Sequence, residues 1–336
     1  MYLDFFGLQK QPFAMTPDPA ILMLTPKHRE ALAGLIFAVN SGKGFVALTG
    51  DAGTGKTTLL RKMMGSQPPS KLQFSFVLNP TLTTSEFLES VLLDFGFVDI
   101  PVSKAQRLVR FQEFLIRSHA EGKISVLVVD EAHKLTPELL EEIRLLTNFE
   151  TADQKLLQII LAGQSELIDL LNQQDLRQLK QRVAVWLGIA PIDESRVSEY
   201  IRIRWRCAGG GSSVPFSPAA AQLIAKWSRG IPRIINAICD NALTNAFGAD
   251  VQTIDAPEIL EVIRDLHLTD SLPARPVPAA RPLLPPPPVE PIIRNGTAAA
   301  ELSPILGSLE RYMPAREREP LLMRWALKLG LKVSGG

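Results

Sequence analysis

The sequence of 336 residues contains little cysteine, and this excludes two common ways of stabilising a small domain. Its two cysteines, Cys207 and Cys239, have no CxxC pair and no cluster of histidines around them. A disulfide scaffold needs more cysteines, and a structural zinc site needs closely spaced ligands. We therefore expect both thiols to be reduced. Because 46% of the residues are hydrophobic, we expect the fold to be stabilised by a buried apolar core.

The sequence also lacks features that would direct it to a membrane. No uninterrupted apolar run reaches the roughly 18 residues that a membrane-spanning helix needs. The start, MYLDFFGLQKQPF, has neither the basic beginning nor the long apolar run of a secretory signal peptide. The net charge of +1 gives no reason to expect nucleic-acid binding, although residues 271–336 carry a surplus of +4 and the remainder −3. We therefore expect a cytoplasmic protein.

Five short apolar segments between positions 1 and 190 have the composition of buried strands. They are residues 44–50, 74–79, 125–130, 157–163 and 183–190. Continuous apolar runs of this length are typical of strands that are buried on both faces of a parallel sheet. Segments with helical spacing separate them, one of which begins with the capping box Thr83-Thr84-Ser85-Glu86. The alternation predicts a doubly wound α/β domain over residues 1–190, with an N-terminal lead over residues 1–40.

After residue 190 the pattern changes to helices alone. The segments 194–208, 217–229, 232–247 and 256–266 predict a four-helix domain over residues 191–268. Residues 273–291 contain nine of the 26 prolines, so we interpret residues 269–300 as a proline-rich linker. Residues 301–336 are weakly amphipathic. A short helical tail that binds a membrane surface or a partner is one interpretation, and a disordered end is the other.

A phosphate-binding pattern, GxxxxGK[ST], lies between the first predicted strand and a predicted helix. The backbone N–H groups of such a loop surround the β-phosphate of a nucleotide at the positive end of the helix. Lys56 is expected to contact the β- and γ-phosphates of ATP, and the Thr57 hydroxyl to bind Mg²⁺. The expected nucleotide-binding residues are Gly50, Asp51, Ala52, Gly53, Thr54, Gly55, Lys56, Thr57 and Thr58.

The third predicted strand ends in two acidic residues, Asp130 and Glu131, as a Walker B segment does. Paired carboxylates at a strand end are costly to bury unless a cation or a substrate lies beside them. We expect Asp130 to hold Mg²⁺ together with Thr57, and Glu131 to orient and activate the attacking water. The sequence Asp-Glu-Ala-His also occurs in one group of helicases, but this chain has no second motor domain, so we do not expect a helicase.

Polar side chains at three further places in the sequence are candidates for contact with the nucleotide of a P-loop ATPase. Gln164 follows the fourth predicted strand and is the candidate sensor of the γ-phosphate. Arg182 precedes the fifth strand and is the candidate that reaches the nucleotide of a neighbouring subunit, with Arg177 as the alternative. Arg233 begins a helix of the four-helix domain and is the candidate that couples loss of the γ-phosphate to domain motion. The other interpretation of each is an ordinary surface residue.

These residues together resemble an AAA+ ATPase, a P-loop NTPase with a five-stranded parallel sheet and a four-helix lid. A closer resemblance, to the general secretion pathway protein A family, covers residues 1–268. It rests on the start of the chain and on VLNPTLTTSEFL, LAGQSEL, LRQLKQRV and GIPRIINAICDNAL. The resemblance implies ATP hydrolysis, a homo-oligomer and work on an envelope secretion or export system. The family's secretion members continue into a transmembrane helix and a peptidoglycan-binding region, where this sequence has its linker and tail, and His133 replaces the usual glutamine.

Three functions from different classes fit these observations. The leading hypothesis is an ATPase whose nucleotide-dependent assembly remodels a partner in an envelope secretion or export system. The main alternative is a DNA-associated ATPase of the transposition-regulator or initiator type, although the slight acidity of the chain before position 271 does not favour it. The third is a switch that recruits a partner when ATP is bound, against which Glu131 and a candidate arginine finger argue. For the leading hypothesis we expect a cytoplasmic protein, and peripheral contact of its tail with the inner membrane is one of the two interpretations of that tail.

Overall fold

The computed structural model describes residues 2–16, 21–66, 68, 70–78 and 81–268. They divide into two compact units. The sheet unit contains Leu24–Ala52 and Lys56–Ala190. The helical unit contains the described residues up to Met23 and from Pro191 onward, with Gly53–Gly55 also assigned to it. The predicted linker over 269–300 and tail over 301–336 lie outside the described residues. Within the described ranges, no helix combines the length and the apolar character needed to cross a membrane.

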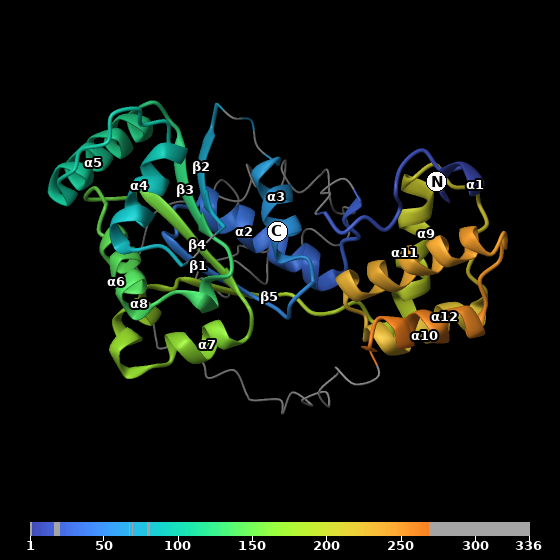
Figure 1. Cartoon of the computed structure of the whole chain (residues 1–336). Coiled ribbons are helices and arrows are strands. Elements are labelled where there is room, and N and C mark those ends of the chain that lie inside the picture. Colours follow the sequence, from blue (N-terminus) through green and yellow to red (C-terminus); the bar gives the residue numbers. More distant parts are fainter. Residues whose placement is uncertain (1, 17–20, 67, 69, 79–80, 269–336) are drawn as a thin grey trace, which may run out of the picture. The chain divides into compact units, whose positions relative to one another are not determined.

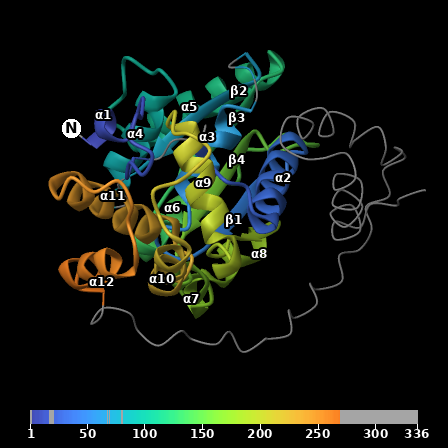
Figure 2. The ribbon, with the colours of Figure 1, turned by 90° about the vertical axis from the view of Figure 1, so that its right-hand side faces the viewer.

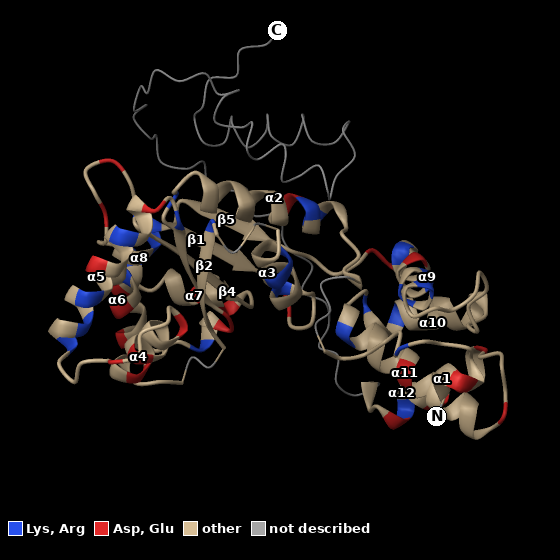
Figure 3. Ribbon diagram, turned by 90° about the horizontal axis from the view of Figure 1, so that it is seen from above, with Lys and Arg blue, Asp and Glu red and all other residues tan. Residues whose placement is uncertain are grey.

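The sheet unit is built on one sheet of five parallel strands (Figure 1). The strands are β1 (Phe45–Thr49), β2 (Leu72–Val77), β3 (Ile124–Val129), β4 (Leu157–Gly163) and β5 (Val185–Gly188). Their order across the sheet is β2-β3-β4-β1-β5, and every neighbouring pair is parallel. None of the five strands contains a charged residue, so the strands are tan in Figure 3. The predicted five-stranded parallel α/β fold is confirmed.

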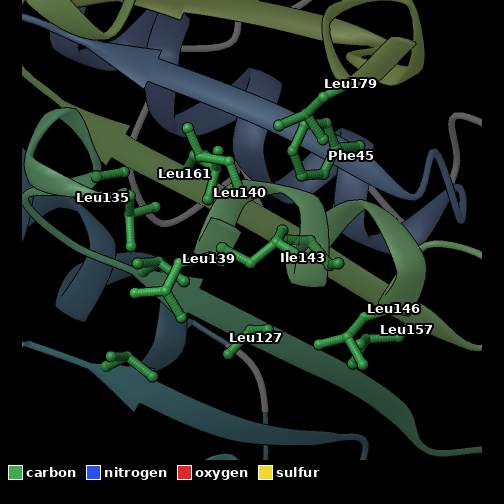
Figure 4. Packing of buried hydrophobic residues seen from close by; sticks show 14 of the residues in the cluster. Phe45, Leu127, Leu135, Leu139, Leu140, Ile143, Leu146, Leu157, Leu161 and Leu179 are labelled. Carbon is green, nitrogen blue, oxygen red and sulfur yellow. The ribbon is translucent and has the colours of Figure 1, made fainter. Parts of the chain in front are cut away.

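Helices cover both faces of this sheet. One layer consists of α2 (Pro26–Asn40), which contacts β5, β1 and β3, and α3 (Lys56–Met64), which contacts β4. The other layer consists of α4 (Thr84–Asp94), α5 (Lys104–Ala120), α6 (Pro137–Leu146), α7 (Glu166–Leu171) and α8 (Arg177–Arg182). In Figure 4, alternate strand residues such as Phe45, Leu127 and Leu161 pack with Leu140 and Ile143 of α6 in one buried cluster. This core fixes the carboxyl ends of the strands, where the candidate site lies.

Strand β5 differs from the prediction that every strand is buried on both faces. Its residues alternate between buried and exposed, and Trp186 remains 39% exposed. The strand lies at the edge of the sheet, beside β1 alone, so the helical layers cover one of its faces only. It is also shorter than the predicted segment 183–190.

The helical unit contains the four helices predicted from the sequence and a short fifth one. They are α9 (Val197–Cys207), α10 (Pro218–Ser228), α11 (Pro232–Gly248), α12 (Ala256–Asp265) and α1 (Tyr2–Phe5). Helices α10, α11 and α12 pack on one another, and α9 packs on α10 (Figure 2). The side chains of Ser217 and Asp255 cap α10 and α12, and a proline follows each cap in the first turn.

The start of the chain belongs to the helical unit, which corrects its assignment as a lead to the sheet domain. Arg204 of α9 is buried, and its Nε donates to the carbonyl oxygen of Pro12 at 2.6 Å. The hydroxyl of Tyr2 donates to Oδ1 of Asp240 on α11 at 2.5 Å. Phe13 is fully buried in the same core as α9 to α12. The apolar side chains between Tyr2 and Phe13 therefore fill part of the core of the helical unit.

Candidate nucleotide-binding site

The phosphate-binding loop connects the end of β1 to the start of α3, as the sequence predicts. β1 ends at Thr49 and α3 begins at Lys56, so residues 50–55 form the turn between them. The N–H of Gly50 donates to the carbonyl oxygen of Gly163 at the end of β4, at 3.3 Å. Gly55 has a φ of 103°, a backbone conformation that side chains with a Cβ rarely adopt. The loop thus turns the N-terminus of α3 back over the sheet edge, which is the geometry of an anion site.

Lys56 is folded over this loop. Its side chain is buried, and Nζ donates to the carbonyl oxygens of Gly50 at 2.8 Å and Asp51 at 3.1 Å. Burial lowers the pKa of the Lys56 ammonium, while the carboxylates of Glu131, Asp130 and other nearby acids oppose this shift. Two neutral carbonyls are weak partners for a buried cation, whereas phosphate oxygens would satisfy it fully.

Thr57 and Asp130, the two predicted Mg²⁺ ligands, are in direct contact. Thr57 Oγ1 donates to Asp130 Oδ2 at 2.5 Å. Asp130 is only 2% exposed, and its Oδ1 accepts from the N–H of Glu131 at 2.9 Å. Thr57 lies in the first turn of α3, which follows β1, and Asp130 directly follows β3. Because β1 and β3 flank β4, both residues lie at the carboxyl ends of the strands.

The donor set fits Mg²⁺. The described residues contain no group of three or more His, Cys, Asp or Glu that could hold a metal by itself. Mg²⁺ is usually held by one or two carboxylates, substrate phosphates and waters rather than by an all-protein cage. A single buried carboxylate beside a hydroxyl, at the mouth of a phosphate loop, is such a donor set. Thr57 and Asp130 would hold the ion.

Glu131 has a left-handed backbone, with φ 53° and ψ 31°. Its carboxylate is 35% exposed, and Oε2 lies 3.1 Å from Nζ of Lys134. Non-glycine residues in this conformation are uncommon and concentrate at functional sites. The turn directs the Glu131 side chain away from the buried end of β3.

Gln164 follows β4 directly, as predicted, but its side chain contacts a residue for which the sequence alone suggests no role. Its backbone N–H donates to Nδ1 of His133 at 3.3 Å, and its side-chain amide lies 3.1 Å from Nε2 of the same ring. The sequence did place His133 close to the site, three positions after Asp130 in the strand-end motif. Without the left-handed turn at Glu131, nothing pointed the ring toward β4.

Arg182 lies at the amino-terminal ends of the strands, whereas the phosphate loop lies at their carboxyl ends. It ends α8, three residues before β5, and so stands where the parallel strands begin. Its Nη1 donates to Oγ1 of Thr147 at 2.6 Å, and it lines a cavity of about 120 Å³ with Lys43 and Lys155. Arg177, at the start of α8, is exposed. Neither arginine therefore reaches the phosphate loop of its own chain.

The remaining predicted residues lie in the phosphate loop, in the first turn of α3 and in the first turn of α11. Thr54 is fully buried, Ala52 is exposed, and Thr58 lies in the first turn of α3. Arg233 is exposed in the first turn of α11, within the helical unit. Its contact with a nucleotide remains a prediction.

Comparison with known proteins gives a family context for this site. Residues 39–171 match the family model of the AAA domain. General secretion pathway protein A of Aeromonas hydrophila is 43% identical over 252 residues, which are 74% of this chain and 45% of that protein. The chain thus matches a little under half the length of its curated relative.

Solved structures with this fold include proteins from an archaeon and an animal. The ORC2 protein of Aeropyrum pernix in its ADP form superposes with a TM-score of 0.60 at 15% identity, over 78% of this chain and 74% of that one. Drosophila ORC bound to DNA gives a TM-score of 0.61 at 18% identity, over 100% of this chain and 80% of that chain. At these identities the likeness concerns the fold alone.

Proposed function

Since the chain carries an AAA domain of P-loop fold and is related over 252 residues to general secretion pathway protein A, we propose that it hydrolyses ATP to ADP and phosphate. The observation that carries the proposal is the contact between Thr57 and Asp130. It joins the phosphate loop to the acidic strand end, as a Mg²⁺-dependent phosphoryl-transfer site requires.

The residues that bind the nucleotide supply charge and position. Lys56 leaves the carbonyls of Gly50 and Asp51 and donates to the β- and γ-phosphate oxygens. Thr57 and Asp130, now hydrogen-bonded to each other, would hold Mg²⁺. When bound, Mg²⁺ neutralises charge on the β- and γ-phosphates. Because phosphoryl transfer needs little covalent help, this positioning and charge neutralisation supply most of the catalysis.

Glu131 is the proposed base. It follows the proposed Mg²⁺ ligand Asp130 directly, and its carboxylate is accessible to a water molecule. In this role the carboxylate accepts a proton from the attacking water, and Gln164 orients the γ-phosphate. A positioned general base contributes roughly 10²- to 10⁴-fold in rate.

We further propose that the site is completed by a second copy of the chain. Arg182 is a cation at the amino-terminal ends of the strands, so it cannot contact a nucleotide at its own phosphate loop, which lies at the carboxyl ends. In a homo-oligomer it would face the nucleotide of a neighbouring subunit, with Arg177 as the alternative, while Arg233 of the same chain senses the γ-phosphate. The name of the relative makes an envelope secretion pathway the proposed setting for this work.

The test is phosphate release by the purified full chain, compared among three variants. Glu131→Gln should bind ATP as the parent does and lose at least about 100-fold in turnover, because an amide is a poor base of similar shape. Lys56→Ala should lose nucleotide binding or hydrolysis. Glu113→Gln, an exposed acid on α5, is the matched control and should behave like the parent. Parental turnover in Glu131→Gln would contradict the assignment of the base.

The partner is tested with the same Glu131→Gln variant as an ATP-locked trap. We expect it to retain components of an envelope secretion system, when these are supplied as purified proteins, in ATP but not in ADP. Turnover that rises on addition of duplex DNA, without such retention, would instead support the DNA-associated alternative.

A further inference from the structure

A single turn places Ala132, His133 and Lys134, the three residues that follow Glu131, beside the carboxyl ends of the strands. The left-handed backbone of Glu131 ends the strand path of β3 and starts the 3₁₀ helix η2 (Ala132–Lys134). The N–H of Lys134 donates to the carbonyl oxygen of Glu131 at 2.9 Å and closes this turn. As a result His133 packs over the end of β4, next to Gly163 and Gln164.

The hydrogen bonds of His133 define its tautomer. A backbone N–H can only donate, so Nδ1, which receives the N–H of Gln164 at 3.3 Å, must be the acceptor. The proton of the neutral ring is then on Nε2. The amide nitrogen of Gln164 lies 3.1 Å from Nε2 of His133, and two N–H groups cannot bond to each other. With the proton on Nε2, the Gln164 amide is therefore turned by 180° about its last bond, so that its oxygen accepts from the ring.

The same Nε2–H also faces the proposed base. Nε2 of His133 lies 3.7 Å from Oε2 of Glu131, just beyond hydrogen-bond distance, while Nζ of Lys134 lies 3.1 Å from that oxygen. The side chain of His133 is only 10% exposed, so it has little freedom to turn away to solvent. One N–H donor therefore stands between the γ-phosphate sensor and the base.

We propose that His133 is a positioning residue that couples Gln164 to Glu131 during the hydrolysis proposed above, on which this inference rests. When the amide of Gln164 turns toward a γ-phosphate, it leaves Nε2–H of His133. That donor then becomes available to Oε2 of Glu131, which moves from Lys134 toward the ring and the attacking water. Binding of ATP, but not of ADP, would thereby bring the base into place.

The test compares variants that keep or lose this one donor. His133→Gln keeps an amide N–H that can reach the place of Nε2, and should retain at least about one third of the parental kcat. His133→Phe keeps a buried ring without an N–H, and should lose about 10- to 100-fold in kcat, as expected when a reacting group is misplaced by about 1 Å. The dissociation constant for ATP should change less than threefold in both variants, because position 133 lies outside the phosphate loop (residues 50–55). Melting temperatures identify any variant that fails to fold.

A double-mutant cycle tests the coupling itself. If His133 acts through Gln164, the double variant His133→Phe/Gln164→Ala should be no slower than the slower single variant. Losses that multiply, parental kcat in His133→Phe, or equal losses in His133→Gln and His133→Phe would each overturn the inference. Glu131→Gln, measured in parallel, separates the two proposals. Parental turnover in Glu131→Gln would contradict the assignment of the base, and a parent chain that releases no phosphate would refute the proposed function. An inactive Glu131→Gln beside a fully active His133→Phe would remove the coupling alone.

Discussion

The hydroxyl of Thr57 and the carboxylate of Asp130 are hydrogen-bonded at 2.5 Å although 73 positions separate them in the sequence. The contact follows from the strand order, since β1 and β3 flank β4 and their carboxyl ends meet at one edge. A hydroxyl and a carboxylate that already face each other need little rearrangement to share one hard cation. The two ligands are thus pre-organised by the sheet.

Removing this hydroxyl should affect the metal step selectively. We expect Thr57→Val, which is similar in shape, to weaken binding of ATP about tenfold in the presence of Mg²⁺, or about 1.4 kcal/mol. Thr57→Ser keeps the donor and should bind like the parent. Titration of a fluorescent ATP analogue, with Mg²⁺ and with a chelator, measures both. Equal affinities of the two variants in Mg²⁺ would show that Thr57 is not a ligand.

Lys56 should destabilise the protein while no phosphate is bound. Its pKa is lowered by burial, so the unfolded chain binds the proton more tightly than the folded one. The unfolding free energy therefore rises with pH toward the ordinary lysine pKa. We expect Lys56→Met to melt at a higher temperature than the parent without nucleotide at pH 7, and this advantage to shrink by pH 9. A parent that melts higher than Lys56→Met at pH 7 would contradict the assigned direction.

Arg182 has two interpretations that one matched variant separates. If the side chain only supports the fold through its hydrogen bond with Thr147, then Thr147→Val should reproduce the defect of Arg182→Ala. If it serves a neighbouring subunit, Arg182→Ala alone should lose about 10³-fold or more in turnover with normal ATP binding. Mixing Arg182→Ala with Lys56→Ala should then restore activity, because one chain supplies the arginine and the other the intact loop. Arg177→Ala in the same assay tests the alternative.

Much of the fold and of the site could be predicted because their signals are local. Continuous apolar runs indicated all five strands, and the spacing from Gly50 to Thr57 identified the phosphate loop. The placement of the start of the chain was missed, because it depends on Arg204 and Pro12, which are 192 positions apart. The contact of His133 with Gln164 was missed for a different reason. It depends on a left-handed backbone at Glu131, and no residue type in that motif predicts such a turn.

Arg204 should be essential for holding the start of the chain on the helical unit. Its Nε donates to Pro12 and its Nη2 to Ala14 at 3.4 Å, both at backbone carbonyls. Arg204→Met would remove these donors from the buried carbonyl of Pro12 and the half-buried carbonyl of Ala14, at a cost of about 2 to 4 kcal/mol. We expect a lower melting temperature and faster proteolysis between Tyr2 and Met23. Arg206→Met, an exposed arginine on the same helix, is the control and should show neither effect.

Gly230 should tolerate no side chain. It has a φ of 71°, and a Cβ at this position would overlap the carbonyl oxygen of Ile192. Gly230→Ala should cost at least about 3 kcal/mol, from backbone strain and from displacement of the neighbouring chain. Gly248→Ala, at the end of α11 with open space around it, should leave stability unchanged or slightly raised. Circular dichroism during heating compares the two, and equal melting temperatures would refute the expected overlap.

The strand order also determines when this chain can fold as it leaves the ribosome. β1 is synthesised first, yet its two partners are β4 and β5, which end at Gly163 and Gly188. The segment from Tyr2 to Phe13 likewise waits for α9 to α12, the last of which ends at Asp265. A nascent chain that ends before Gly188 leaves apolar strand edges of β1 unpaired, the kind of surface that aggregates or recruits chaperones. Each unit therefore completes its folding only after most of the described chain has been synthesised.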